Sequence, residues 1–437
     1  MSDYISYKNN IKSDRTGFCA LPFVQYSTFN GGKYRLCCMA KEPGDVGKTD
    51  VNQEELGIEG TWNHDYIKDV RQKMADGQWV PECSECDHLE RNEIMSSRQW
   101  ENNVWGDQIE DIVAKSRENN WEVDQPLQFD FRLGNLCNLQ CQMCNKDASH
   151  LVSVERRAMI DTGLGLPDND EWRHDNLKTK KEALLQPGID WESFEQMLPY
   201  AQKIKMIGGE PTVSPDMFKL LDIACELGYA KNIELSFYTN ITNMQDRWLK
   251  QLGQFKKVIV NCSLEGMGAM NDYLRPPSKW DSVWKNFDKL VEFANTPAGK
   301  PIKVRITTVN QVSNALHIVP FWRFLHEYQC TKDKGIGMST NQLIEPHYYS
   351  MAMSPQWLRD EQKAQVLEFL EEIKDSEHFE DYEDPLMEMV QFGEDSEHAY
   401  DERRMRQYVA VTENYDKHRG HDIMSVAPEF ERIKKDL

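Results

Sequence analysis

Three cysteines lie close together in the sequence FDFRLGNLCNLQCQMCNKDAS, which runs from Phe129 to Ser149. Cys137, Cys141 and Cys144 have a C-x3-C-x2-C spacing. Three thiolates on one tight loop can ligate three irons of a 4Fe–4S cluster and leave the fourth iron open. A structural zinc site wants four ligands, usually as two C-x2-C pairs, and a redox dithiol needs only two cysteines. The spacing therefore predicts an iron–sulfur cluster with a vacant coordination position.

A second group of cysteines precedes this loop. Cys19 and Cys37 flank two strand-like runs joined by an Asn-Gly-Gly turn, which predicts a β-hairpin. Cys83 and Cys86 follow as a C-x2-C pair. Together they form a four-ligand set that suits either structural zinc or an iron–sulfur cluster. Cys38 is the alternative ligand if Cys37 points away.

Strand and helix patterns alternate along the centre of the chain, which predicts an α/β fold with a parallel sheet. Functional groups in such sheets gather at the C-terminal ends of the strands. The expected strands are Leu127–Leu133, Lys203–Ile207, Ile233–Tyr238, Lys257–Leu264, Lys303–Val309 and Ile336–Leu343.

Several residues suited to ligand binding follow these expected strands. Glycines let a ligand approach the backbone, hydroxyl and amide groups donate hydrogen bonds, and an arginine can grip a carboxylate with two donors. A polar turn that caps a helix is an equally good interpretation of the residues after the third strand. The candidate residues are Gly208, Gly209, Glu210, Thr239, Asn240, Ser263 and Arg275.

The stretch GNLCNLQCQMCNKDAS resembles the signature of radical S-adenosylmethionine (SAM) enzymes. The resemblance implies that Cys137, Cys141 and Cys144 ligate a 4Fe–4S cluster whose open iron binds the amino and carboxylate groups of SAM. Reduction would then split SAM into methionine and a 5′-deoxyadenosyl radical, which abstracts a hydrogen atom from the substrate. In such enzymes the cofactor carries the chemistry and the protein supplies position and shielding.

The same resemblance assigns roles to the strand-end residues. The Gly-Gly-Glu-Pro turn at 208–211 would hold the SAM amino group, and Ser263 and Arg275 would hold its carboxylate. Thr239 and Asn240 are candidates to hydrogen-bond the ribose. No acid, base or further cysteine stands out as the group that would act on the substrate.

The earlier cysteines resemble a twitch module, the short form of the SPASM domain. Cys19, Gly32 and Cys37 have a C-x12-G-x4-C spacing, and the pair Cys83 and Cys86 comes later. The resemblance implies a second, auxiliary 4Fe–4S cluster on these four cysteines, with an electron-transfer or structural role. Such modules commonly follow the barrel, whereas this one precedes it.

The radical SAM resemblance implies an open (β/α)6 partial TIM barrel. We expect a twitch-like β-hairpin and helix module over residues 1–105, the barrel over 125–345, and a helical extension over 346–437. Within the extension, an amphipathic helix should be followed by an acidic loop, DSEHFEDYEDP, and then by a helix rich in charge from Ser396 to about Tyr415.

Composition limits the possible partners and locations. A formal net charge of -21 disfavours general binding to nucleic acid or to anionic membranes. No apolar run approaches the roughly 20 residues that span a bilayer, and the first residues lack the apolar stretch of a signal peptide. Eleven cysteines, eight of them in motif-like groups, suit a reducing compartment, so we expect a cytoplasmic protein. A flavodoxin- or ferredoxin-type protein would supply the electron.

The leading hypothesis is a radical SAM enzyme that modifies a peptide or protein. Dehydrogenation or rearrangement of a small molecule is the alternative within the same chemistry. A zinc-binding structural scaffold, with cysteines that serve only the fold, belongs to a different class. Methyl transfer from SAM by a non-radical route would leave three exposed thiols of low pKa without a task.

Overall fold

The computed structural model describes residues 16–41, 53–91, 95–106, 108–165, 180–332, 335–394 and 400–437. These residues form two compact units. The first comprises the described residues up to Asn135, together with 185–237 and 254–257. The second comprises the described residues of 136–184, 238–253 and 258–437.

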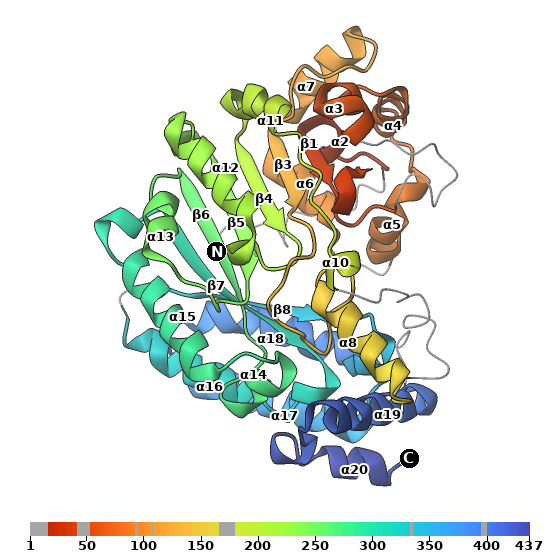
Figure 1. Ribbon diagram of the computed structural model, residues 1–437, viewed down its shortest axis with the longest axis vertical. Coiled ribbons are helices and arrows are strands. Elements are labelled where there is room, and N and C mark those ends of the chain that lie inside the picture. Colours follow the sequence, from red (N-terminus) through yellow and green to blue (C-terminus); the bar gives the residue numbers. More distant parts are fainter. Residues whose placement is uncertain are drawn as a thin grey trace. The chain divides into compact units, whose positions relative to one another are not determined.

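The strands of the first unit lie in the order β2-β1-β3-β4-β5 (Figure 1). The expected hairpin is present as the antiparallel pair β1 and β2, and β1 also pairs in parallel with β3. The hairpin therefore extends the parallel sheet. The strands are β1 (Gln25–Thr28), β2 (Tyr34–Arg35), β3 (Gln128–Arg132), β4 (Lys203–Ile207) and β5 (Glu234–Thr239), which passes into the second unit after Phe237.

Aromatic residues cover one face of this sheet. Phe129 and Phe131 point to the same side of β3, and each ring meets the edge of Phe194 at 5.3 Å between centroids. Phe194 lies on α11, which therefore packs on this face. The helices of the first unit are α2 (Leu21–Val24), α3 (Gln53–Trp62), α4 (Asp65–Ala75), α5 (Ser84–Arg91), α6 (Ser97–Trp105), α7 (Gln108–Glu118), α11 (Trp191–Met197) and α12 (Pro215–Glu226).

The second unit has three parallel strands in the order β6-β7-β8. These are β6 (Lys257–Ser263, from Val258 on in this unit), β7 (Ile302–Asn310) and β8 (Gly337–Gln342). Its helices are α8 (His150–Asp161), α10 (Lys180–Ala183), α13 (Asp246–Leu252), α14 (Ala269–Leu274), α15 (Trp280–Ala294), α16 (Ile318–Cys330), α17 (Gln356–Ile373), α18 (Phe379–Glu394), α19 (Glu402–Arg419) and α20 (Phe430–Lys435).

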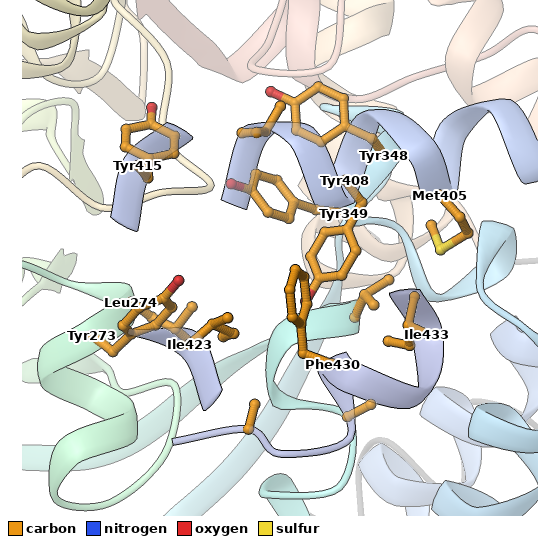
Figure 2. Packing of buried hydrophobic residues seen from close by; sticks show 14 of the residues in the cluster. Tyr273, Leu274, Tyr348, Tyr349, Met405, Tyr408, Tyr415, Ile423, Phe430 and Ile433 are labelled. Atoms are coloured by element: carbon orange, nitrogen blue, oxygen red, sulfur yellow. The ribbon is translucent and has the colours of Figure 1, made fainter. Parts of the chain in front are cut away.

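The last two helices belong to a tyrosine-rich core of the second unit. Figure 2 shows Tyr408 of α19 close to Tyr349, with Phe430 of α20 beside them, and Tyr415 of α19 apart from these three. The ring of Tyr408 meets those of Tyr349 and Phe430 at 5.8 and 5.7 Å. Tyr273 of α14 is part of the same cluster. Residues near the C-terminus are therefore integral to this unit.

Each of the six strands expected from the sequence is found within one residue of its expected ends. The chain has the expected α/β fold, with a mostly parallel and open arrangement of strands. The six-unit partial barrel and the three-domain division stay predictions. No helix among the described residues has the length and apolar character that a membrane crossing needs.

The expected acidic loop of the C-terminal segment is wrong, because most of it belongs to α18. Pro385 lies inside this helix, which is why the sequence favoured a loop. Tyr382, Leu386 and Met389 recur at helical spacing and are fully buried. Burial of this apolar face outweighs the local preference of the acidic residues and the proline.

We predict that Gly134→Ala destabilises the first unit more than Gly163→Ala destabilises the second. Both glycines have similar φ, +71° and +76°, so each alanine costs about 1–2 kcal/mol of backbone strain. At Gly134 the new Cβ would also lie 2.3 Å from the carbonyl oxygen of Leu185, whereas nothing lies within 4 Å at Gly163. Urea unfolding measures both losses. Equal losses would show that the contact at Leu185 does not restrain the chain.

Candidate functional site

The three clustered cysteines lie on a loop of the second unit, just before α8. Cys141 is buried, and none of the eleven cysteines forms a disulfide. The loop folds back on itself: Leu139 N–H donates to Cys137 Sγ at 3.5 Å, and Ser149 Oγ donates to the Leu139 carbonyl at 2.9 Å. The buried His150 accepts from Cys137 N–H through Nδ1 at 3.4 Å. These hydrogen bonds within the loop and to α8 define its shape.

The end of α14 holds the middle of this loop. Gln140 N–H donates to the Pro276 carbonyl at 2.7 Å, and Gln142 N–H donates to the Leu274 carbonyl at 3.0 Å. These two residues flank Cys141. The segment after β6 thus fixes the position of the central thiol, although it follows the loop by more than 130 residues.

Arg275 lies directly against that thiol. Its Nη1 is 3.7 Å from Cys141 Sγ, while its Nε and Nη2 both donate to Glu265 Oε1. Glu265 is fully buried and is held in turn by Val309 N–H, which donates to Oε2 at 2.6 Å. A fixed positive charge therefore stands beside the central cysteine, with a buried carboxylate behind it.

The electrostatics of Cys141 suit a metal ligand. Burial raises the pKa of Cys141 to about 12, and the positive charge of Arg275 partly opposes this rise. A thiol must lose its proton to bind a metal, and a nearby cation stabilises the resulting thiolate. The donor set of the loop therefore fits a cluster of net negative charge.

The residues after β5 also reach the cysteine loop. Asn240 Nδ2 donates to Asn138 Oδ1 at 2.9 Å, and Asn138 Nδ2 donates to Thr242 Oγ1 at 2.7 Å. The Thr239 hydroxyl accepts from Ile241 N–H at 3.0 Å and so stabilises the turn that follows β5. Of the two residues expected at this strand end, Asn240 contacts the loop and Thr239 shapes the turn.

Ser263 and the Gly-Gly-Glu-Pro turn lie at strand ends, as expected. Ser263 is half-buried at the end of β6, in the second unit. Gly208 and Gly209 follow β4 in the first unit, with φ of +92° and +35°. Glu210 is 2% exposed and accepts from Thr212 N–H at 3.0 Å. The structure brings Arg275 and, through Asn138, Asn240 to the cysteine loop; the glycine turn belongs to the other unit.

The second set of cysteines comes together in the first unit. Burial raises the pKa of Cys19, and the charges of Cys83 and Cys86 raise it further. Burial likewise raises the pKa of Cys37, with further contributions from Cys38, Cys19 and Cys86. Such contributions come from nearby charges, so these cysteines lie in one region of the first unit.

Cys38 points elsewhere. Lys205 Nζ lies 3.7 Å from Cys38 Sγ and 3.5 Å from Asp130 Oδ2. Burial raises the pKa of Cys38, and Lys205 opposes this rise. Of the adjacent pair, Cys37 is the one whose pKa is raised by Cys19 and Cys86, whereas no cysteine is among the main contributors to the raised pKa of Cys38.

A buried arginine also stands beside this second group. Arg98 pairs with Glu90 at 2.5 Å, and both side chains are less than a tenth exposed. Its Nη1 donates at 2.7 Å to the carbonyl of Phe18, the residue before Cys19. Arg98 favours the thiolate form of Cys19 and thereby lowers the pKa that burial has raised.

One face of the first unit's sheet is polar, which the sequence analysis missed. In the parallel register, Ser27, Asp130 and Lys205 are directly paired across β1, β3 and β4, and so are Gln25, Gln128 and Lys203. Gln128 Nε2 donates to Gln25 Oε1 at 2.6 Å. Asp130 is 2% exposed, and its Oδ1 has no hydrogen-bond partner among the described residues. Strands of a parallel sheet are usually apolar on both faces. The alternation of polar residues in these strands was therefore the sequence signal that could have indicated a polar face.

No group of three or more His, Cys, Asp or Glu side chains in the described part of the chain surrounds a single metal-ion position. In a cubane cluster each cysteine binds a different iron, so its thiolates are spread more widely than the ligands of one ion.

The central part of the chain is similar to a known family. Residues 131–312 match the family described as Radical SAM superfamily. This range contains all three loop cysteines, the glycine turn, Ser263 and Arg275. No match was found among the curated proteins.

Solved structures give distant similarities. SuiB of Streptococcus suis bound to S-adenosylmethionine is 16% identical with a TM-score of 0.37, over 76% of this chain and 66% of SuiB. The protein anSMEcpe with bound AdoMet and Cp18Cys peptide is 16% identical with a TM-score of 0.35, over 57% of this chain and 60% of its own. The chain covers less than two thirds of either relative.

We predict that Glu265→Gln lowers the free energy of unfolding by about 3–5 kcal/mol, because it leaves the Arg275 charge buried without a counter-charge. Glu402→Gln is the matched control: Glu402 pairs with Arg406 on the surface, so its loss should cost about 0–1 kcal/mol. Urea unfolding of the metal-free protein measures both. A similar small loss in the two variants would contradict the role assigned to the buried pair.

Proposed function

Starting from a chain that carries a Radical SAM superfamily domain over residues 131–312, we propose that it is a radical SAM enzyme. Cys137, Cys141 and Cys144 would ligate a 4Fe–4S cluster whose fourth iron binds SAM. The observation that carries this proposal is the cysteine loop itself. Its central thiol is buried and positioned within 3.7 Å of the Arg275 guanidinium.

When the cluster is bound and reduced, it and SAM together supply a 5′-deoxyadenosyl radical that abstracts a hydrogen atom from the substrate. The residues of this chain prepare that chemistry. Arg275 stabilises the thiolate of Cys141, and Glu265 keeps the guanidinium in place. The hydrogen bond between Asn240 and Asn138 orients the loop between Cys137 and Cys141.

We assign SAM contacts as the sequence resemblance implies. The turn of Gly208, Gly209 and Glu210 would bind the amino group, and its positive φ values show a backbone that only glycine adopts readily. Ser263 and Arg275 would bind the carboxylate. Arg275 has five N–H donors, and three contacts, two to Glu265 and one to Cys141, leave donors for a ligand. Thr239 and Asn240 are the proposed ribose contacts.

The second group of cysteines would hold an auxiliary 4Fe–4S cluster. The mutual influence of Cys19, Cys37, Cys83 and Cys86 on their pKa values supports these four ligands, and the contact of Cys38 with Lys205 supports Cys37 over its neighbour. Four protein ligands leave no open iron, so this cluster would transfer electrons or stabilise the fold.

The proposed substrate is a peptide or protein, and a small molecule that is dehydrogenated or rearranged is the alternative. The polar face of the first unit supports a substrate rich in hydrogen-bonding groups. Asp130 and Lys205 are placed there as a buried acceptor and a half-buried cation. A flavodoxin- or ferredoxin-type donor would reduce the cluster.

We predict that anaerobically reconstituted protein forms 5′-deoxyadenosine from SAM in the presence of a strong reductant. The triple variant Cys137→Ala, Cys141→Ala, Cys144→Ala should form none, because no iron could then bind SAM. Cys225→Ala is the matched control, since Cys225 is a half-buried cysteine of α12 outside both groups. Liquid chromatography quantifies the product. Product formation by the triple variant at the wild-type rate would refute the assignment.

We predict that Cys37→Ala and Cys38→Ala differ in bound iron. Wild-type protein should hold about eight irons per chain, the sum of two 4Fe–4S clusters. Cys37→Ala should hold about four, because the auxiliary cluster loses a ligand, while Cys38→Ala should keep about eight. Iron and acid-labile sulfide assays measure both. The opposite pattern would make Cys38 the ligand, and equal full occupancy would argue against a cluster at this site.

A further inference from the structure

The last residue of α19 reaches the cysteine loop. Arg419 follows Gln140 by 279 residues, and its Nη2 donates to the Gln140 carbonyl at 2.7 Å. Gln140 immediately precedes Cys141. The sequence analysis predicted a helical extension over 346–437 and did not link it to the cysteine loop. The hydrogen bond of Arg419 makes this link.

The same guanidinium forms a buried ion pair. Arg419 Nε and Nη2 donate to the two carboxylate oxygens of Glu155 at 2.7 and 2.6 Å. The two side chains are 7% and 4% exposed. A forked contact of this kind fixes the orientation of the arginine as well as its position.

Glu155 lies on α8, which begins where the cysteine loop ends. The neighbouring Arg156 donates from Nη2 to the Cys144 carbonyl at 2.9 Å. Two arginines therefore bind loop carbonyls on either side of Cys141, one directly from α8 and one from α19. Both carbonyls belong to the short stretch that carries the thiols.

The end of α19 is itself held firmly. The ring of Tyr415 lies 4.3 Å from the Arg419 guanidinium carbon, and Tyr273 donates its hydroxyl to Asp416 at 2.8 Å. Figure 2 shows Tyr415 on α19 and Tyr273 on α14 within the buried cluster. Gly420 then ends the helix in the left-handed conformation, with φ of +67°. Arg419 is thus presented from a rigid support.

The other cysteine group repeats this arrangement independently. Arg98 pairs with a buried glutamate, Glu90, and donates to the carbonyl of the residue that precedes Cys19. The same three partners, a buried carboxylate, a guanidinium and the carbonyl just before a cysteine, occur at both groups. Two unrelated ion pairs would not be expected to contact the carbonyl just before a cysteine in both groups, so the repetition favours a role at the cysteines.

We propose that Arg419 is a positioning residue for the cluster loop, so that α19 is part of the cluster-binding structure. This inference rests on the proposed function. Arg419 fixes the carbonyl before Cys141 and thereby sets the direction of the Cys141 side chain before a cluster arrives. Outer residues that orient metal ligands in this way typically change metal affinity or activity by about 10- to 100-fold when they are replaced.

The test compares Arg419→Gln with Arg406→Gln in anaerobically reconstituted full-length protein. Arg406 lies on the same helix, but it is exposed and pairs with Glu402 on the surface. The first readout is the rate at which a ferrous chelator removes iron, with and without SAM. Only a cluster with an open iron can be protected by SAM, so the SAM-protected fraction reports on the loop. The second readout is the change that SAM produces in the electron paramagnetic resonance spectrum of the reduced protein.

We predict that Arg419→Gln loses the SAM-protected iron about 10- to 100-fold faster than wild type and shows a weakened spectral response to SAM. Arg406→Gln should match wild type. Arg419→Lys should release iron at a rate between those of wild type and Arg419→Gln, because a lysine can still donate to one carbonyl. Arg419→Gln alone leaves the Glu155 charge buried and unpaired, which could prevent folding. The double variant Glu155→Gln, Arg419→Gln removes both charges and avoids this problem. It should behave like Arg419→Gln.

Wild-type rates and spectra in the folded double variant would overturn the role of Arg419. If SAM changes neither the iron release nor the spectrum of wild-type protein, that result would count against the proposed function instead. Circular dichroism of the metal-free variants confirms that the comparison is made on folded protein.

Discussion

Buried arginine–glutamate pairs beside cysteines are the constraint on which this structure depends. A thiol in a buried position resists ionisation, yet a metal ligand must lose its proton. A guanidinium beside the sulfur or its backbone offsets that penalty, and a buried carboxylate prevents the guanidinium from becoming an unpaired charge. Among the described residues, this arrangement occurs in the pairs Arg275–Glu265, Arg419–Glu155 and Arg98–Glu90.

The parallel strands explain how these groups come together. Each strand ends at the same edge as its parallel neighbour, so residues from distant parts of the sequence are delivered to one region. In the second unit, the segments after β5 and β6 supply Asn240 and Arg275 to the cysteine loop. The C-terminal helix adds Arg419 to the same loop. The loop contributes the proposed ligands, and the surrounding elements contribute charge and orientation.

Much of this could be predicted from the sequence because it depends on local patterns. The six expected strands, which the structure confirms, follow from alternation and spacing. The choice of Cys137, Cys141 and Cys144 as the proposed ligands follows from their mutual separation in the sequence. Cys37 was preferred to Cys38 only because its spacing to Cys19 and Gly32 resembles that of a twitch module, since adjacent residues share most local signals. The contact of Cys38 with Lys205 on another strand supports the proposed choice of Cys37.

Other features depend on long-range contacts that leave little trace in the sequence. Arg419 is one of three basic residues in the last turn of a charged helix, and nothing local marks it as a partner of Gln140. Arg275 was expected to bind a carboxylate of SAM, whereas its strongest partner within the protein is Glu265. The polar alternation of β3 and β4 was visible, but its meaning depends on knowing that these strands pair in parallel.

The central claim is that the loop around Cys141 binds a cluster with one iron open to SAM. Mössbauer spectroscopy of protein reconstituted with 57Fe, recorded before and after addition of SAM, tests this most directly. One iron site should change its isomer shift and quadrupole splitting when SAM binds, while the other sites keep theirs. A spectrum that SAM leaves unchanged, or one without cubane iron, would show that the loop does not bind such a cluster.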